Sequence, residues 1–202
     1  MRFCSSCGGP IERRVPPLDD RERHVCRSCA TVHYSNPKVV VGSVCTLGDR
    51  LLLCRRAIAP SRGLWTIPAG YLENGETVEE GAQREAWEEA RAAIDLEGLI
   101  AVYSIKRIDQ VQLLFRARLA KPEVAAGPES LEVMLVGWDD IPWAELAFPT
   151  VHWVLRRAAE LHGQSGPFVP VGNPPSRVDG LAVPPEQGSL ARACGGSGTQ
   201  AD

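Results

Sequence analysis

A glycine-bounded loop and the glutamate-rich segment after it are the part of this sequence whose residue types and spacing could do chemistry. The loop begins at Gly70, and the polar residues follow it at fixed intervals: Glu76, Arg84, Glu85, Glu88 and Glu89. Clustered carboxylates bind hard divalent cations, and such cations beside a loop are typical of phosphate chemistry. The spacing therefore predicts a cation site in which Glu85, Glu88 and Glu89 are the ligands.

A helix must carry these glutamates, and the sequence predicts where it begins. Thr77 and Glu80 form a capping box, in which each side chain accepts a hydrogen bond from the other residue's backbone N–H. Apolar residues then recur every three or four positions and mark one buried stripe: Val78, Ala82, Ala86, Ala90 and Ala93.

The three glutamates fall on this helix within an arc of about 100° that adjoins the alanine stripe. Carboxylates beside a buried face repel one another unless a cation neutralises them. The alternative is an ordinary solvated charged face, which is the commoner fate of a glutamate run. The outward side already carries other polar residues, and this favours the metal site: Glu80, Gln83, Arg84 and Arg91.

Two Cys-x-x-Cys pairs near the N-terminus predict a second metal site. Cys4 and Cys7 form one pair, Cys26 and Cys29 form the other, and 18 residues separate them. This spacing is typical of a zinc ribbon, in which four thiolates bind one tetrahedral Zn²⁺. Incidental cysteines or a redox-active pair are the alternatives. Residues 1–36 are too few to build a core alone, so we expect the zinc to be structural.

The composition of the whole chain limits the classes of protein that it can represent. Its 202 residues allow one ordinary domain and a small accessory one, and 44% hydrophobic residues suffice for a core. A net charge of -3 argues against a general nucleic-acid or membrane surface binder. No apolar run approaches a transmembrane length, and the first residues lack the apolar core of a signal peptide. We therefore expect a cytoplasmic protein that binds neither membrane nor nucleic acid.

The remaining segments predict a layered α/β domain. Residues 38–46 and 50–56 are typical of a β-hairpin, and further strands are expected over residues 64–67, 99–104, 110–119 and 131–138. An apolar stripe predicts a closing helix over residues 151–162. Strands on both sides of a helix, closed by a second helix, give layers. We predict a zinc ribbon at 1–36, the α/β domain at 37–168, and a Pro- and Gly-rich disordered tail at 169–202.

The spacing Gly-x5-Glu-x7-Arg-Glu-x-x-Glu-Glu, from Gly70 to Glu89, closely resembles the signature box of the Nudix hydrolases. The likeness covers roughly residues 3–170 and includes His33-Tyr-Ser-Asn-Pro-Lys38 and Gly63-Leu-Trp-Thr-Ile-Pro-Ala-Gly70. It resembles the zinc-ribbon Nudix hydrolases of bacteria and the plant plastid Nudix enzymes active on FAD and ADP-ribose. The resemblance implies a Nudix α/β/α sandwich with a mixed sheet. It also implies dependence on Mg²⁺ or Mn²⁺ and cleavage of a nucleoside diphosphate linked to another group.

The resemblance further implies roles for individual residues. The metal ligands would be three glutamates of the box: Glu85, Glu88 and Glu89. Gly70 would admit the close approach of backbone to phosphate or metal. Arg84 would fix a box glutamate by a charge pair, and Glu76 would brace the loop against the helix. The alternatives are a surface arginine and a glutamate that interacts with the helix dipole.

One position departs from the family pattern. The box normally continues Glu-Glu-x-Gly, but Arg91 stands in place of the glycine. That glycine usually adopts a left-handed conformation at the helix end, which costs an arginine about 1 kcal/mol. We expect Arg91 to adopt it all the same, with the alternative that the helix runs on through Ala92 and Ala93. Activity should survive, because the metal ligands lie upstream.

Hydrolysis also needs a general base and a pocket for the substrate. We prefer Glu132 as the base, with Glu129 second, because Glu132 shares a strand face with Met134 and Val136 and could point inward. Both could instead be surface residues. The candidates for substrate contact are aromatic rings and phosphate-binding arginines: Trp65, Tyr71, Phe148, Arg55 and Arg56. Core packing explains an aromatic residue equally well, and only one of two adjacent arginines on a strand can point inward.

We therefore predict a metal-dependent hydrolase of nucleoside diphosphates linked to another moiety, with FAD or ADP-ribose as the preferred substrates. The second hypothesis is an NADH or NAD-capped-RNA pyrophosphatase. That class carries a Ser-Gln-Pro-Trp-Pro-Phe-Pro stretch after the box, whereas this chain has Ser104-Ile-Lys-Arg-Ile-Asp-Gln110. The third is a non-catalytic Nudix-fold sensor or partner-binding protein, which the retained carboxylates disfavour. A homodimer is a further expectation of the resemblance.

Overall fold

The computed structural model describes residues 1–175 and divides into two units, Met1–Pro37 and a domain that begins at Lys38. The disorder expected from residue 176 onward lies outside the described residues. Each unit is built on its own β-sheet.

The N-terminal unit is a three-stranded antiparallel sheet. Its strands are β1 (Ile11–Arg14), β2 (Arg23–Cys26) and β3 (Val32–His33), and β2 lies between the other two. Within residues 1–37, Val25 is the one aliphatic side chain that is fully buried. So small an apolar core cannot hold the unit together by itself, which agrees with the need for a metal ion.

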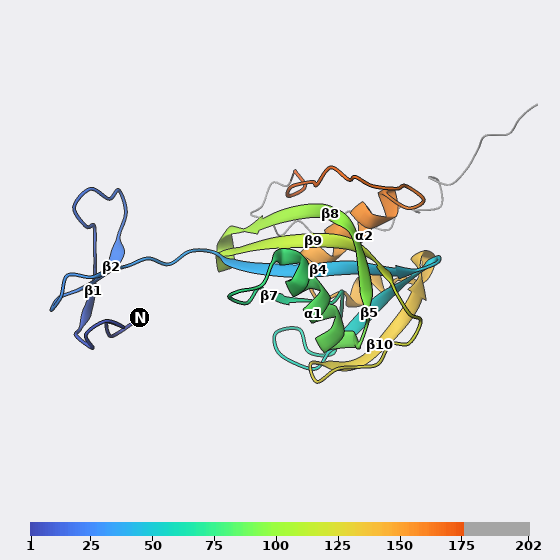
Figure 1. The fold of residues 1–202 in the computed structure, drawn as a ribbon, viewed down its shortest axis with the longest axis horizontal. Helices are drawn as coiled ribbons and strands as arrows, with labels where there is room; N and C mark the ends of the chain where they lie inside the picture. Colours follow the sequence, from blue (N-terminus) through green and yellow to red (C-terminus); the bar gives the residue numbers. More distant parts are fainter. Residues whose placement is uncertain (176–202) are drawn as a thin grey trace, which may run out of the picture. The chain divides into compact units, whose positions relative to one another are not determined.

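The domain from Lys38 is built on a seven-stranded sheet, and this sheet is mixed, as predicted. Its main order is β10-β5-β4-β9-β8, in which β4 and β9 are parallel and the other neighbours are antiparallel (Figure 1). These strands are β4 (Lys38–Leu47), β5 (Arg50–Arg56), β8 (Ile94–Ile105), β9 (Gln110–Leu119) and β10 (Ser130–Gly137). The short strands β6 (Trp65–Thr66) and β7 (Ala69–Tyr71) pair with β5 and β4.

Two helices cover opposite faces of this sheet and complete the α/β/α sandwich: α1 (Val78–Ala90) and α2 (Pro149–Glu160) (Figure 1). Alternation along β5 decides which layer each of its residues joins. Leu51 and Leu53 belong to the core cluster that α2 covers, whereas Leu52 and Cys54 belong to the cluster that α1 covers. Three short 3-10 helices complete the elements: η1 (Lys106–Ile108), η2 (Trp138–Asp140) and η3 (Trp143–Glu145). Between residues 1 and 175, no helix is long and apolar enough to cross a membrane.

Two expected boundaries differ from the structure. β8 begins at Ile94, whereas the sequence predicted a strand from residue 99. The earlier start was not predicted because the pairing is irregular between Leu96 and Gly98, which interrupts the alternation of buried and exposed side chains that marks a strand. The predicted start of the disordered tail, residue 169, is too early, because Val171 pairs with Ala101 of β8. Backbone pairing with an open sheet edge and the packing of Val171 against the core order this stretch, although the tail is rich in proline and glycine.

Candidate active site

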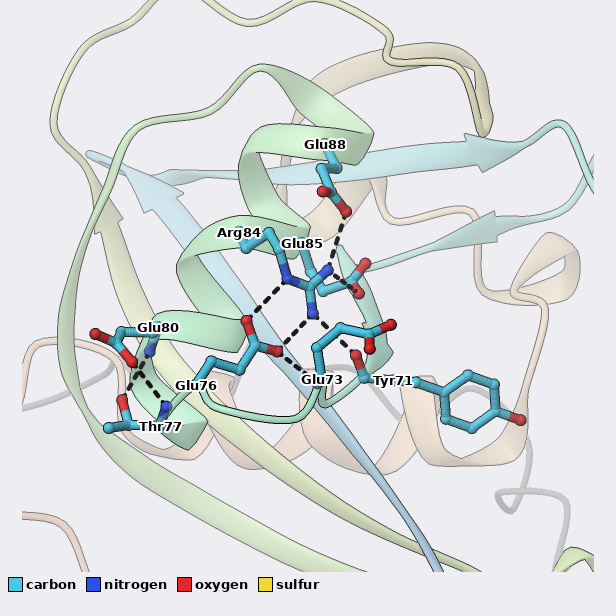
Figure 2. Close-up of polar contacts among 8 residues, drawn as sticks. All are labelled: Tyr71, Glu73, Glu76, Thr77, Glu80, Arg84, Glu85 and Glu88. Carbon is cyan, nitrogen blue, oxygen red and sulfur yellow. Dashed lines mark hydrogen bonds and ion pairs between the residues drawn. The ribbon is translucent and has the colours of Figure 1, made fainter. Parts of the chain in front are cut away.

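The loop–helix junction that carries the glutamates folds as its local sequence predicts. Thr77 Oγ1 accepts from the Glu80 N–H at 3.2 Å, and Glu80 Oε2 accepts from the Thr77 N–H at 2.8 Å (Figure 2). Ala82, Ala86 and Ala90 are fully buried along one side of α1. Ala93 lies beyond the helix and is exposed, so its place in the stripe was wrong.

The helix ends at Ala90, and Arg91 has a left-handed backbone with φ 50° and ψ 27°. The left-handed ending is therefore confirmed, even though arginine replaces the usual glycine. The Arg91 side chain lies back over the helix, with its guanidinium 5.8 Å from the centre of the Trp87 ring.

Arg84 is the centre of a polar network that joins α1 to the preceding loop (Figure 2). Its Nε and Nη2 bind both oxygens of Glu76, at 3.0 and 2.7 Å. Its Nη1 reaches Glu85 at 2.7 Å and Glu88 at 3.0 Å, and Nη2 also donates to the Tyr71 carbonyl at 2.9 Å. Hydrogen bonds from Arg84 and from the Glu73 N–H lower the pKa of Glu76 to about 2. Arg84 therefore fixes three glutamates and the loop in one arrangement.

Two of the three expected metal ligands are buried. Glu85 and Glu89 are 8% and 6% exposed, whereas the Glu88 side chain is 54% exposed. Burial raises the pKa of Glu89 to about 8; Glu85 and Glu129 add to the rise, and the Ala69 N–H and Arg56 oppose it. Burial also raises the pKa of Glu85, against the opposing effect of Arg84. Ionising both groups is unfavourable without a further positive charge, so this donor set fits a hard divalent cation.

Two glycines let the backbone approach these carboxylates closely. A Cβ at Gly70 would overlap the Glu85 carboxylate, and a Cβ at Gly127 would overlap the Glu88 carbonyl oxygen. The Gly127 N–H donates to the Glu89 carbonyl and the Ala125 N–H to the Ala90 carbonyl, both at 2.9 Å. The loop before β10 thus satisfies the free carbonyls at the end of α1. The sequence alone does not reveal this role of Gly127, because the contact joins segments that are distant along the chain.

The glutamates face a cleft of about 860 Å³. Glu85, Glu88, Glu89 and Glu129 line it, together with arginine, aromatic and amide side chains from other elements: Arg56, Tyr71, Phe148, Arg107 and Gln110. The Arg56 guanidinium lies 5.1 Å from the centre of the Phe148 ring, and Lys38 Nζ lies 5.0 Å from that of Tyr71. Each ring is therefore held beside a cation at the cleft.

The expectation that Glu132 points inward is wrong. Its side chain is 52% exposed, pairs with Arg55 Nη1 at 3.4 Å and does not line the cleft. The physical reason is a bulge: the β10–β5 register pairs Ser130 with Arg56 but Glu132 with Arg55, and thus skips Leu131. Glu129, the second candidate for the base, is the one that lines the cleft.

Two substrate-contact candidates also lie elsewhere. Trp65 is 7% exposed and belongs to the core cluster that α2 covers, so it is a packing residue. Arg55 donates to the Gly63 carbonyl at 2.8 Å and pairs with Glu132. Arg56 faces the cleft, and the alternation of strand β5 therefore directs one arginine to it.

The four cysteines of the N-terminal unit lie together. Their sulfurs are all within 4.8 Å of one another, with 3.7 Å between Cys4 and Cys29 and 3.5 Å between Cys7 and Cys26. Zn–S bonds of about 2.3 Å in a tetrahedron would place sulfurs about 3.8 Å apart, so the cluster fits one zinc ion. His33 Nε2 lies 3.2 Å from the Cys4 sulfur, at the edge of this cluster.

Comparison with known families agrees with this geometry. Residues 36–157 match the family described as NUDIX domain, and residues 2–35 match the one described as Nudix N-terminal. The chain belongs to the Nudix family. Its box, residues 70–91, is the loop and helix described above, and its N-terminal unit is the zinc-ribbon region that precedes such a domain.

Several Nudix relatives share much of the chain. The NAD-capped RNA hydrolase NudC of Stutzerimonas stutzeri is 32% identical over 84% of this chain and 60% of its own length. An ADP-ribose pyrophosphatase of Methanocaldococcus jannaschii is 30% identical over 57% of this chain and 69% of its own. A crystal structure of a NUDIX hydrolase from Nitrosomonas europaea is 46% identical, with a TM-score of 0.80, over 85% of this chain and 98% of that one. The chain spans only about three fifths of the length of two such NudC relatives, 60% and 58%.

Proposed function

We propose that this Nudix protein is a divalent-metal-dependent hydrolase that cleaves the pyrophosphate bond of a nucleoside diphosphate linked to another moiety. The observation that carries the proposal is the placement of the box glutamates. Buried Glu85 and Glu89 and the more exposed Glu88 face an 860 Å³ cleft that also contains Arg56 and two aromatic rings. A cleft lined by carboxylates together with arginine and aromatic groups suits a phosphate bridge between ring-bearing groups.

In the proposed reaction, the residues that would hold Mg²⁺ or Mn²⁺ are Glu85, Glu88 and Glu89. The cation would neutralise the pyrophosphate and make an attacking water more acidic. Arg84 orients Glu85 and Glu88 through its two short contacts. Glu129 lines the same cleft and is our candidate to accept the proton of the attacking water. In-line attack of that water on one phosphorus expels a phosphate-ended product.

Substrate preference rests on the two rings. Tyr71 is 47% exposed and Phe148 is partly buried, and both line the cleft. We propose that they stack on ring systems of the substrate, and that Arg56 contacts its phosphates. FAD and ADP-ribose, the first candidates, both offer an adenosine diphosphate for this arrangement.

A second candidate substrate class is NADH or NAD-capped RNA. It is favoured by the relatives named NAD-capped RNA hydrolase, which align with 84% and 79% of this chain. The same cleft suits either class, since both contain a pyrophosphate attached to an adenosine.

One experiment separates these possibilities. FAD, ADP-ribose, NADH and NAD-capped RNA are offered with Mg²⁺ or Mn²⁺, and the phosphate-ended products are identified by mass. We expect AMP from each small molecule that is cleaved, and the highest kcat/KM names the preferred class. Glu88→Gln should lower turnover by at least ~100-fold, whereas Glu79→Gln, an exposed position on the same helix, should not. Tight binding of a nucleotide without any hydrolysis would instead favour a sensor.

We further propose that the four cysteines bind one Zn²⁺ that holds the N-terminal unit folded. The sulfur spacing and the small apolar core of that unit support this role.

A further inference from the structure

The segment that follows α2 runs along β8, the edge strand of the sheet (Figure 1). We call residues 166–173 the strap. The Val171 N–H donates to the Ile100 carbonyl at 3.1 Å, and the Val171 carbonyl accepts from the Val102 N–H at 2.9 Å. The strap therefore acts as a partial extra strand on an otherwise open edge.

Side chains of the domain hold the strap in place. Phe168 and Val171 pack against the core cluster that α2 covers. Arg157 Nη2 donates to the Val169 carbonyl at 3.0 Å, and the Arg116 guanidinium lies 5.0 Å from the centre of the Phe168 ring. The strap is thus fixed before the chain reaches Asn173.

Asn173 ends the strap with two hydrogen bonds to a single residue of β8. Its Oδ1 accepts from the Ser104 N–H at 2.8 Å, and its Nδ2 donates to the Ser104 carbonyl at 2.9 Å. Ser104 lies opposite Val111 of β9, and in alternate residues of an antiparallel ladder the N–H and C=O point away from the partner strand. Asn173 therefore supplies the backbone pairing that β9 cannot give to Ser104.

The backbone just after Ser104 forms a wall of the cleft. Ile105, Arg107 and Ile108 line the cleft, and the last two belong to η1. Gln110 follows, and its Nε2 donates to the Tyr71 hydroxyl at 3.1 Å. Ser104 is thus only a few residues along the chain from the side chains that would meet the substrate.

We infer that the strap positions the η1 wall of the cleft, and that Asn173 is a positioning residue for substrate binding. The consequence for substrate rests on the proposed function of this cleft. Asn173 is not among the described residues that line the cleft, so it acts through Ser104. The metal-binding glutamates lie on α1, a different element, so turnover of bound substrate should be preserved.

The test is Asn173→Ala in the full chain, assayed with the best substrate of the panel. We expect KM to rise about fivefold while kcat stays within about twofold. Amide hydrogen exchange at Ser104, Arg107 and Ile108 should become about tenfold faster, with exchange in β4 unchanged. Asn173→Asp keeps the acceptor for the Ser104 N–H but loses the donor, and its effects should be intermediate. Gln164→Ala removes a similar single bond, to the Glu160 carbonyl at 2.9 Å, and should change neither quantity.

Unchanged exchange at Ser104 and η1 in Asn173→Ala would overturn the inference, as would an unchanged KM or a fall in kcat alone. Faster exchange throughout the sheet would also overturn it, because the residue would then act on global stability. If the wild-type chain hydrolyses nothing in the panel, the proposed function fails. The exchange measurement alone then decides whether the strap holds the η1 wall.

Discussion

Arg84 and Glu76 form a two-point ion pair, with Nε 3.0 Å from Oε2 and Nη2 2.7 Å from Oε1. The pair joins the middle of α1 to the loop that precedes it, because Glu76 also accepts from the Glu73 N–H and Arg84 also donates to the Tyr71 carbonyl. The remaining guanidinium nitrogen contacts Glu85 and Glu88. All three nitrogens of the Arg84 guanidinium therefore donate hydrogen bonds.

Lysine at this position would keep the charge but lose the geometry. A single ammonium cannot bind both oxygens of Glu76 and also reach Glu85 and Glu88. We expect Arg84→Lys to lower kcat by at least ~10-fold with Mg²⁺ saturating, while the protein remains folded by circular dichroism. Arg118→Lys is the matched control, because Arg118 is 64% exposed and has one ion pair, with Asp95. A normal kcat for Arg84→Lys would show that the two-point pair is dispensable.

Two nearby carboxylates can be compared directly: Glu129 lies in the loop before β10, and Glu132 lies on β10 itself. Only Glu129 lines the cleft, whereas Glu132 pairs with Arg55 at the surface. If Glu129 is the general base, Glu129→Gln should lower kcat by about 10²–10⁴-fold, and Glu132→Gln should stay within about twofold of wild type. Steady-state kinetics of both variants measure these two kcat values. A larger fall in kcat for Glu132→Gln than for Glu129→Gln would favour Glu132 as the base.

The sequence predicted the box well because its determinants are local. The capping residues, the buried alanines and the order of the glutamates all lie within one loop and one helix. The inward direction of Glu132 failed because a bulge depends on how β10 pairs with β5, which no short-range pattern encodes. Trp65 failed as a stacking residue for a related reason: residue type alone does not distinguish a ring in the core from one in a cleft.

The strap was missed because its order comes from its partner. The segment from residue 169 onward was expected to be disordered because it is rich in proline and glycine. The open edge of β8 and the Ser104 backbone supply the hydrogen bonds that hold this stretch. Such pairing is visible only when both segments are placed in space.

Glu89 should make the stability of the Mg²⁺-free protein depend on pH. Burial raises its pKa from 4.5 to about 8. Between these values the native state keeps a proton that the unfolded chain has lost, so the contribution of Glu89 to stability is fully present below pH 4.5 and is lost as the pH rises to about 8. Glu89→Gln removes this titration and should flatten the fall in melting temperature over that window. Chelators are left out, so that the zinc site is kept.

Two further measurements check the assignment to Glu89. Glu79→Gln changes the same charge at an exposed site of α1 and should leave the slope unchanged. Mg²⁺ should stabilise the wild type more at the upper end of the window than at the lower end, since binding requires the carboxylate. An equal slope for wild type and Glu89→Gln would contradict the prediction.

The cysteine cluster predicts one zinc ion per chain. Cys26→Ser removes one of four sulfurs that lie within 4.8 Å of one another, and we expect the purified variant to lose zinc and the N-terminal unit to unfold. Metal analysis gives the stoichiometry, and proteolysis within residues 1–37 reports the unfolding. Cys45→Ala is the control, because Cys45 is buried in the core of the other unit. Wild-type protein without zinc, after purification without chelators, would refute the zinc site.

Arg91→Gly tests the left-handed end of α1. Arg91 has φ 50°, a conformation that glycine adopts without strain and that costs other residues about 1 kcal/mol. Its side chain offers little in return, with a 3.4 Å hydrogen bond to the Trp87 carbonyl and a cation 5.8 Å from the Trp87 ring. Glycine also makes the unfolded chain more flexible, so the net gain in the free energy of unfolding should be up to ~1 kcal/mol. This corresponds to a rise of about 2–4 °C in melting temperature.

Arg91→Ala separates the effect of the backbone strain from that of the side-chain contacts. Alanine loses the contacts but keeps the strain, so this variant should be no more stable than wild type. A lower melting temperature for Arg91→Gly would mean that the contacts with Trp87 outweigh the backbone strain.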